Sequence, residues 1–570
     1  MKKIYRYMLK YWPAYIFTLV CMFIAIGLDM MYPQITKVIV NEVFGTADLK
    51  GLPMLLLAIV LVGLGRSIFG YCQEFTSDVI GAKIGTDMRK DLFRHIQSLS
   101  VDYFDDANTG ELMARVKDDV DKVRFALGFV GIFAVQFVVH VVSVLYCMFT
   151  LSWKLTIVPL CVMILCGVVA LVMEKKLDKV YEDISEENAQ LTTVAEENLA
   201  GVRTVKAFAR EKFEINKFLS HNNRYYELNM QLSKTWVRYY PIFQFVGTLL
   251  PVTMAILGGV MVMRKEMDIG SLVAYIEYSR NCTWPMQSLG WITNDLSGAI
   301  ASMKKINKIS KQNATMNEPA EPVILEEIRG EMAFEHVSFA IDGKQILEDI
   351  SFTVPQGKTL GIMGATGSGK STIVNLMDRF YDPTEGTVLL DGTDVKNMTF
   401  AQVRGSSAVV MQDVFLFSDT IEENIKMGKR ESMDIEDIRR AAAFAQAKDF
   451  IEEMDASYET VIGERGVGLS GGQKQRISIA RAIAKKCPIL VMDDSTSALD
   501  METEHEIQKT LEQMDGITKI IIAHRISAVR HADEIIYLQN GKIAERGTHE
   551  ELLKQKGLYY DTYVVQYGEV

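Results

Sequence analysis

The chain has 570 residues, of which 61 are basic and 72 acidic, so its formal net charge is −11. This length corresponds to about three or four average domains, and the acidic balance argues against a nucleic-acid binder that depends on a large basic surface. Apolar residues make up 49% and charged residues 23%, values that an ordinary globular chain also has. The averages conceal a difference, because residues 1–310 hold nearly all the long apolar runs and residues 329–570 have the composition of a soluble α/β domain.

Six windows in the first part are long and apolar enough to cross a membrane. A helix needs about 20 apolar residues to span a hydrocarbon core of about 30 Å. The basic N-terminus leads into the first window, and no small-residue cleavage site follows, so we expect a retained span rather than a signal peptide. The windows are residues 12–32, 52–72, 128–150, 154–174, 240–263 and 270–292.

The connections between these windows alternate between short and long. Residues 73–127 and 175–239 are long, polar and rich in Lys and Arg. The bias of basic residues therefore places both segments, the N-terminus and everything after residue 300 in the cytoplasm. Both segments keep apolar residues at helical spacing, so we expect the membrane helices to continue into the cytoplasm and to turn back near Phe104 and Phe208. The short connections, which carry few cations, are residues 33–51, 151–153 and 264–269.

Some side chains within the spans are candidates for lining a substrate cavity. Polar groups in a membrane are costly, so Glu277 is a candidate, together with Trp284 and Gln287. The alternative is that a side chain near the end of a span extends to the water outside. The chain also contains 30 methionines, whose flexible side chains would suit an adaptable pocket for varied hydrophobic compounds. The alternative is that they pack between helices or face lipid.

A polar stretch with Pro319 and Pro322 marks a boundary between two domains. Beyond it, runs typical of β-strands alternate with helical patterns, which predicts a mostly parallel sheet covered by helices. The predicted fold class is a membrane α-helical domain with six long transmembrane helices, followed by an α/β nucleotide-binding domain. The predicted limits are residues 1–310 for the membrane domain, 311–328 for a linker and 329–570 for the nucleotide-binding domain.

A glycine-rich loop carries the first chemical signal. Residues 364–371 read Gly-Ala-Thr-Gly-Ser-Gly-Lys-Ser and follow a strand-like run, which fits the phosphate-loop pattern G-x-x-x-x-G-K-[ST]. Backbone N–H groups of such a loop and the start of the next helix hold phosphates, so we expect ATP to bind here. Lys370 should reach the β- and γ-phosphates, and the Ser371 hydroxyl should ligate Mg²⁺. The candidate binding residues of this segment are Gly364, Thr366, Gly367, Ser368, Gly369, Lys370, Ser371 and Thr372.

Two further strand ends supply carboxylates and a histidine. Four apolar residues, 489–492, are typical of a buried strand and lead into Asp493 and Asp494. We expect Asp493 to support the Mg²⁺ shell and Asp494 to orient or deprotonate the attacking water. Another apolar run, 519–523, ends at His524, which could contact the γ-phosphate or be an ordinary histidine at a strand end.

Residues 469–473, Leu-Ser-Gly-Gly-Gln, lie between the phosphate loop and Asp493. This order of motifs resembles the ATP-binding cassette (ABC) transporter family, and six spans followed by one cassette look like a half-transporter of the type IV exporter group. The resemblance implies that two cassettes pack head to tail, with each ATP between one chain's phosphate loop and the other chain's Ser-Gly-Gly-Gln segment. The residues assigned to that segment are Ser470, Gly471, Gly472 and Gln473.

The resemblance assigns roles to other segments as well. Residues 409–412 match the family's glutamine loop, which makes Gln412 a candidate Mg²⁺ ligand and catalytic residue beside Asp494 and His524. Residues 460–466 resemble the exporter segment that touches the membrane part. The turns near Phe104 and Phe208 resemble the coupling helices, which pass the motion of the cassettes to the spans.

Two departures from the family pattern concern one nucleotide site. The residue after the magnesium aspartate is usually Glu, but here it is Asp494, and Ile341 occupies the place of an aromatic residue that stacks on adenine. Both changes suggest a site that binds ATP but hydrolyses it poorly. We therefore predict a heterodimer with a second half-transporter that carries Glu. The alternatives are a slow homodimer, an ATP-gated channel and an importer of the same fold group.

These features together imply ATP and Mg²⁺ as cofactors and a multi-pass location in the cell membrane, which we expect to be a bacterial plasma membrane. The expected substrate is a small hydrophobic or amphipathic molecule, such as a drug, a lipid or a peptide. The expected partners are the lipid bilayer and the second subunit, with no nucleic acid.

Overall fold

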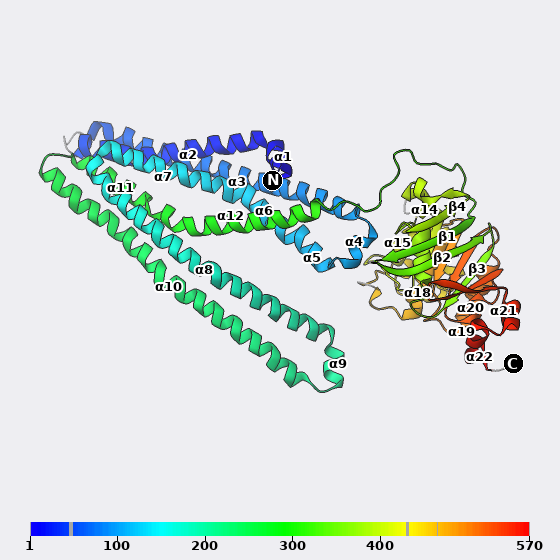
Figure 1. Cartoon of the computed structure of the whole chain (residues 1–570). Coiled ribbons are helices and arrows are strands. Elements are labelled where there is room, and N and C mark those ends of the chain that lie inside the picture. The colour runs from blue at the N-terminus through cyan, green and yellow to red at the C-terminus, as the bar shows by residue number, and fades with distance from the viewer. Residues whose placement is uncertain (1, 45–48, 342, 429–432, 464–465, 569–570) are drawn as a thin grey trace. The chain divides into compact units, whose positions relative to one another are not determined.

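The computed structural model of the chain describes residues 2–44, 49–341, 343–428, 433–463 and 466–568. The chain forms two compact units (Figure 1). The first unit comprises Met1–Ser98 and Ala107–Asn313. The second comprises Ala314–Val570 together with Leu99–Asp106. A short segment from the helical half of the sequence therefore belongs to the C-terminal unit.

The described part of the first unit is helical throughout. Three stretches have π-helical hydrogen bonding, Ile39–Phe44, Arg115–Asp119 and Ala126–Val130, and Leu49–Gly51 forms a 3₁₀ turn. The α-helices are α1 (Lys2–Lys10), α2 (Trp12–Val38), α3 (Leu52–Gln97), α5 (Thr109–Ala114), α6 (Val120–Phe125), α7 (Gly131–Leu151), α8 (Trp153–Ala200), α9 (Val202–Ala207), α10 (Glu211–Met263), α11 (Ile269–Asn281) and α12 (Thr283–Ser310).

Five continuous helical segments of the described chain are long and apolar enough to cross a membrane, and they contain the first five predicted windows. The sixth predicted window, residues 270–292, is different. Helix α11 ends at Asn281 and α12 begins at Thr283, so this window is an interrupted helix. Pro285 lies in the first turn of α12, where a residue without an N–H costs no helical hydrogen bond. The five segments are Trp12–Phe44, Leu49–Gln97, Thr109–Leu151, Trp153–Ala200 and Glu211–Met263.

The helices extend well beyond a membrane's thickness, as the sequence predicted. Helix α8 has 48 residues and α10 has 53, whereas about 20 suffice to cross the hydrocarbon core. The two helices lie side by side and are joined through the short helix α9, which ends just before Phe208 (Figure 1). The first predicted short loop, residues 33–51, is mostly helical, because α2 continues past Pro33 and leads into Ile39–Phe44.

The second unit contains two sheets. A four-stranded sheet has the order β2-β1-β4-β5 with antiparallel pairs, and a six-stranded sheet has the order β10-β9-β3-β8-β7-β6. In the larger sheet, β9, β3, β8, β7 and β6 are parallel, and only β10 pairs antiparallel. The strands are β1 (Met332–Ile341), β2 (Lys344–Val354), β3 (Thr359–Gly364), β4 (Glu385–Leu390), β5 (Thr393–Asp394), β6 (Ser407–Val410), β7 (Ile489–Asp493), β8 (Thr518–Ile522), β9 (Glu534–Gln539) and β10 (Lys542–Gly547).

Helices cover these sheets and also form a subdomain of their own. One buried apolar cluster joins the two sheets, and Phe334 of β1 stacks there on Phe352 of β2 with ring centroids 4.6 Å apart. A second cluster surrounds α15, α16 and α18. The fold class predicted from the sequence is confirmed. The α-helices are α4 (Val101–Asp106), α13 (Lys370–Met377), α14 (Phe400–Ser406), α15 (Ile421–Lys426), α16 (Ile435–Phe444), α17 (Lys448–Glu452), α18 (Gly471–Ala484), α19 (Met501–Glu512), α20 (Ile526–Val529), α21 (His549–Gln555) and α22 (Leu558–Tyr567).

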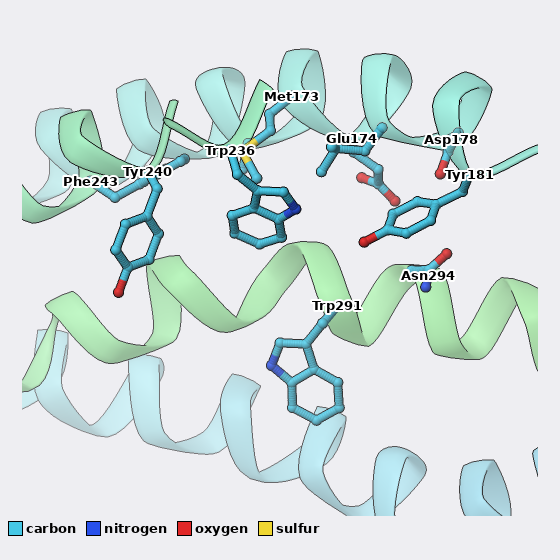
Figure 2. Close-up of a pocket in the computed structure, with 11 residues that line it drawn as sticks. Met173, Glu174, Asp178, Tyr181, Trp236, Tyr240, Phe243, Trp291 and Asn294 are labelled. Carbon is cyan, nitrogen blue, oxygen red and sulfur yellow. The ribbon is translucent and has the colours of Figure 1, made fainter. Parts of the chain in front are cut away.

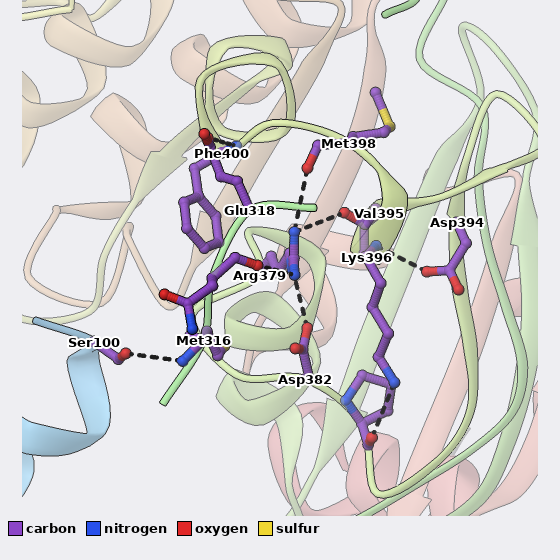
Figure 3. A network of polar contacts seen from close by, with 12 residues as sticks. Ser100, Met316, Glu318, Arg379, Asp382, Asp394, Val395, Lys396, Met398 and Phe400 are labelled. Carbon is purple, nitrogen blue, oxygen red and sulfur yellow. Dashed lines mark hydrogen bonds and ion pairs between the residues drawn. The ribbon is translucent and has the colours of Figure 1, made fainter. Parts of the chain in front are cut away.

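A buried arginine forms hydrogen bonds that connect the start of this unit to its core (Figure 3). Arg379 is 3% exposed and follows α13 closely. Its guanidinium donates hydrogen bonds to the carbonyl oxygens of Asn317, Val395 and Met398 at 3.2 to 3.3 Å, and to the Asp382 carboxylate at 3.0 Å. The N–H of Met316 donates to Ser100 Oγ at 3.2 Å, just before α4. The chain around residue 317 is therefore an ordered part of the unit.

Candidate nucleotide site

Four predicted site segments follow adjacent parallel strands. The phosphate loop follows β3, His524 follows β8, Asp493 ends β7, and Gln412 follows β6. Because these strands are parallel and neighbouring, their carboxyl ends lie along one edge of the sheet. Ligands of open α/β sheets bind at this edge, so the topology gathers residues that are up to 160 positions apart in the sequence, from Gly364 to His524.

The glycines of the loop are needed for its path. Gly364 has φ +149°, and a Cβ there would lie 2.3 Å from the carbonyl oxygen of Leu538. Gly369 has φ +101°, and a Cβ there would lie 2.5 Å from Leu347 Cδ2. Any larger residue would push the loop away from the sheet. The loop leads directly into α13, whose first turn presents free backbone N–H groups.

Two side chains of the loop are placed to hold phosphate. Lys370 Nζ folds over the loop and donates to the carbonyl oxygens of Gly364 and Ala365 at 2.8 and 2.9 Å. Burial lowers the pKa of Lys370, and the nearby carboxylates Asp493 and Asp494 oppose that shift. Ser368 is 5% exposed, and its Oγ has no hydrogen-bond partner among the described residues. A buried hydroxyl without a partner fits a ligand that supplies acceptor oxygens, as a phosphate does.

The predicted magnesium pair lies together. Asp493 is 8% exposed, and burial raises the pKa of its carboxyl group, whereas a hydrogen bond with Ser371 lowers it. The Asp494 charge also raises this pKa, and the charges of Lys370 and His524 lower it, so all these groups surround one carboxylate. A hydroxyl and a carboxylate side by side are hard oxygen donors of the kind that Mg²⁺ prefers. The residues present therefore fit the predicted ion.

Asp494 is held by its backbone rather than by its side chain. It is half-buried, its φ of +44° lies in the left-handed region, and its N–H donates to the carbonyl oxygen of Ile522 at 2.9 Å. A non-glycine residue in this conformation costs free energy and persists only where the surroundings enforce it. The position of the Asp494 Cα is thus fixed relative to β8.

Thr372 follows Ser371 on α13 and is half-buried. Other predicted residues are not brought to the loop by contacts of the described chain: Gln412 is exposed, and Ile341 is 43% exposed at the end of β1 in the other sheet. Ser470 caps α18: its Oγ accepts from the Gln473 N–H at 3.2 Å, and Gln473 Oε1 accepts from the Ser470 N–H at 2.9 Å. Among the described residues, no hydrogen bond joins Ser470, Gly471, Gly472 or Gln473 to residues 364–372.

A buried carboxylate that the sequence did not reveal joins the loops that follow β7 and β8. Glu504 on α19 is 4% exposed and accepts from Arg525 Nη1 at 2.9 Å. Its other oxygen accepts from the hydroxyls of Thr496 and Ser527 at 3.3 Å. Thr496 follows Asp494 and Arg525 follows His524, so one side chain fixes both loops. The amphipathic pattern of α19 gave no signal that this Glu points inward.

Two sequence predictions concern residues that are only partly described. Residues 464 and 465 of the segment 460–466 lie outside the described residues, and Val461 beside them is 71% exposed. Among the candidate cavity residues, Glu277 forms an ion pair with Arg280 at 3.2 Å, and the side chains of Trp284 and Gln287 lie outside the described ones.

A phosphate-binding loop on a parallel sheet, joined to a bundle of membrane-spanning helices, defines an ATP-dependent membrane transporter. Comparisons with known proteins agree. The family profile of the ABC transporter transmembrane region matches residues 15–286, and that of the ABC transporter ATP-binding domain matches residues 347–497. The chain belongs to the ABC transporter family. The second match implies binding and hydrolysis of ATP coupled to transport.

Relatives match along the whole chain. YknU of Bacillus subtilis, an uncharacterized ABC transporter ATP-binding protein, is 35% identical over 99% of this chain and 97% of its own length. The ATP-dependent lipid A-core flippase of Sodalis glossinidius is 33% identical over 95% of this chain and 93% of its own length. A structure of a bacterial Atm1-family ABC exporter with ATP bound, at 25% identity, covers 98% of this chain and 99% of its own with a TM-score of 0.83. The chain therefore has the fold of an ABC exporter, a class whose members act as dimers in the membrane.

Proposed function

We propose that this chain is one half of a heterodimeric exporter, which uses ATP to move a hydrophobic or amphipathic small molecule across the membrane by alternating access. The similarity to a lipid A-core flippase and to YgaD of Bacillus subtilis, a putative multidrug export protein 32% identical over 99% of this chain, supports this substrate class. The predicted domain limits and the cytoplasmic side of the N-terminus and the cassette belong to the same proposal.

Each residue of the site has its own proposed role in binding or hydrolysing ATP. Lys370 and Ser368 would bind the phosphates, and Ser371, Asp493 and Gln412 would hold Mg²⁺, which would neutralise phosphate charge when bound. Asp494 orients or deprotonates the attacking water, and His524 contacts the γ-phosphate. Ile341 packs against adenine through dispersion alone, because it has no ring to stack. The segment from Ser470 to Gln473 completes the site of the partner subunit. Ser470 and Gln473 form hydrogen bonds with each other, and none with the described residues of the loop in their own chain, which supports this division.

The presence of Asp494 in place of the usual Glu is the main observation that supports a heterodimer. Compared with the usual Glu, its side chain is one methylene shorter, so its carboxylate withdraws from the substrate by about a bond length. The backbone at Asp494 is held by its hydrogen bond to Ile522 and by its left-handed conformation, so the main chain does not move forward to compensate. A misplacement of about 1 Å can reduce a rate by about 10²-fold. This site should therefore bind ATP and turn it over slowly.

ATP turnover by the full chain, purified without another subunit in lipid nanodiscs, tests this proposal. We expect slow turnover, and we expect Asp494→Glu to raise it by up to about 10²-fold. Glu506→Gln is the control on exposed surface of α19, and Asp493→Asn should abolish turnover in either background. Rapid turnover by the unmodified chain, with transport in the absence of any partner, would refute the heterodimer.

Transport direction needs a separate measurement. In inside-out vesicles that contain the chain and its partner, uptake of substrate upon addition of ATP supports export. ATP-dependent loss of substrate from loaded vesicles of this orientation indicates an importer, and flux without ATP consumption indicates a channel.

A further inference from the structure

The helical unit contains a cavity of about 120 Å³ between α8, α10 and α12 (Figure 2). Its apolar floor is formed by Met173, Leu177 and Phe243, which are each 7 to 8% exposed and pack together. No residue of the nucleotide-binding unit lines it. The cavity is therefore independent of the ATP site.

Aromatic rings from all three helices form the walls. Tyr181 comes from α8, Trp236 and Tyr240 come from α10, and Trp291 comes from α12. Trp291 is supported from behind, since its ring lies 4.9 Å from that of Phe133 between centroids. The other three rings are 40 to 42% exposed, so their faces are accessible to a ligand.

The charged groups that line the cavity are all negative. Glu174 and Asp178 stand four residues apart on one face of α8 and point toward the space in front of Asn294 (Figure 2). Within the described chain, neither carboxylate has an ion pair or a hydrogen bond. Like charges at this spacing destabilise a helix. Since neither carboxylate is paired within the described chain, no ion pair or hydrogen bond compensates for this repulsion.

Nearby lysines do not neutralise these carboxylates. Lys176 turns away from the cavity, donates to the hydroxyl of Tyr239 at 2.9 Å and lies 5.4 Å from the centre of that ring. Lys175 and Lys179 do not line the cavity. Two carboxylates beside several aromatic faces, with no cation among the lining groups, form a site that is electrostatically complementary to a positive ligand.

The position along the helices suits a ligand that partitions into a membrane. Glu174, Tyr240 and Trp291 all lie at the cytoplasmic ends of predicted spans, those of residues 154–174, 240–263 and 270–292. Trp and Tyr are common at this depth, where they usually face the headgroups. Here Tyr181, Trp236 and Tyr240 line one space together with the carboxylates, which a general interfacial belt does not require (Figure 2).

We propose that this cavity binds an organic cation, with its positive centre beside Glu174 and Asp178 and its apolar groups against the aromatic walls. Cation–π attraction and the two carboxylates favour the charge, and the floor favours apolar bulk. The ligand class is a lipophilic ammonium or phosphonium rather than an anionic lipid. The inference rests on the proposed export function for its biological role, whereas binding itself requires neither ATP nor a partner.

Equilibrium dialysis with the full chain in phosphatidylcholine nanodiscs tests the proposal without nucleotide. Phenyltrimethylammonium and benzenesulfonate each have one phenyl ring with a tetrahedral group of similar size and opposite charge, so their comparison tests the sign of the charge. We expect the cation to bind at least about tenfold more tightly than the anion, after subtraction of binding to empty nanodiscs, a difference of about 1.4 kcal/mol. Equal or tighter binding of the anion would overturn the proposal.

Variants locate the site. The double variant Glu174→Gln with Asp178→Asn should lose at least about tenfold in cation affinity and leave anion affinity unchanged or improved. Glu182→Gln with Glu186→Gln removes the same charge from α8 outside the cavity and should bind like the parent. Trp236→Leu replaces an exposed aromatic face of the cavity by a smaller apolar side chain, so it should weaken binding of the cation, and it provides a second test if the double variant fails to fold. Unchanged cation binding in the cavity variants would overturn the assignment.

A failure of the cavity proposal and a failure of the proposed export function would give different results. Cation binding without ATP-dependent transport of any compound by the assembled exporter would refute export and leave the cavity assignment standing. ATP-dependent transport, with no preference for the cation in the dialysis, would support export and refute the assignment of the cavity.

Discussion

Replacement of Arg379 should loosen the attachment of the linker to the nucleotide-binding unit. Arg379→Gln removes the donors that reach the carbonyl oxygen of Asn317 and two carbonyls at Val395 and Met398. A hydrogen bond to a charged group contributes about 1.5–3 kcal/mol, and breaking a buried ion pair costs about 3–5 kcal/mol. Asp382 keeps 32% of its side chain exposed and can be hydrated, so the lower end, about 3 kcal/mol, is appropriate.

This loss should appear as a lower melting temperature of the second unit. For a unit of this size, 1 kcal/mol corresponds to about 2–4 °C, so the expected decrease is about 6–12 °C. Tryptophan fluorescence cannot report it, because Trp12, Trp153, Trp236, Trp284 and Trp291 all lie in the first unit.

Cys487 provides the probe. It is 6% exposed and is the sole cysteine of the second unit's sequence. Brief alkylation of the full chain at increasing temperature, followed by mass spectrometry of the peptide that contains Cys487, measures the melting of this unit. Arg546→Gln is the control, because its ion pair with Glu534 is exposed and should contribute less than about 1 kcal/mol. Equal melting temperatures of the Arg379 variant and the control would refute the reasoning.

Two further predictions concern the nucleotide site. Gly364→Ala should abolish binding of a fluorescent ATP analogue, because its Cβ would meet the Leu538 carbonyl oxygen at 2.3 Å, whereas Gly405→Ala, with no atom within 4 Å, should bind normally. Normal binding by Gly364→Ala would contradict the loop geometry. Glu504→Gln should lower turnover in the Asp494→Glu background by about tenfold while ATP affinity stays within about twofold, because it loosens the catalytic loops without touching the phosphate loop. A matching loss of affinity would show instead a general structural defect.

Part of the architecture could be predicted from local sequence patterns. The phosphate loop and the strands that end at Asp493 and near His524 could be predicted because each depends on a few neighbouring residues. Five spans and the long helical extensions followed from apolar composition and helical spacing. The interruption at Cys282 did not, because window hydropathy does not register where a proline-containing segment starts a new helix.

The other missed features involve contacts between distant residues. Glu504 and Arg525 are 21 residues apart, and Arg379 and Asn317 are 62 apart, so no spacing rule links them. The cavity of Glu174 and Trp291 likewise needs three helices to be packed before its lining is defined. Periodicity indicates that a helix has an inner face, but not which helix that face will meet.

In the proposed dimer, Ser470 would serve both the structure of its own chain and the nucleotide site of its partner. Its Oγ accepts the Gln473 N–H, which closes the first turn of α18. A hydroxyl has two acceptor lone pairs and one donor, so this cap leaves the proton of Ser470 available. That proton, together with the N–H groups of Gly471 and Gly472 at the helix start, can be donated to a phosphate oxygen held by the partner's loop. Gln475 of the same helix accepts from the N–H of Ala498 at 3.1 Å, in the loop after Asp494. In the proposed dimer, a displacement of α18 by the partner's nucleotide would therefore act, through Gln475 and Ala498, on the loop that follows Asp494.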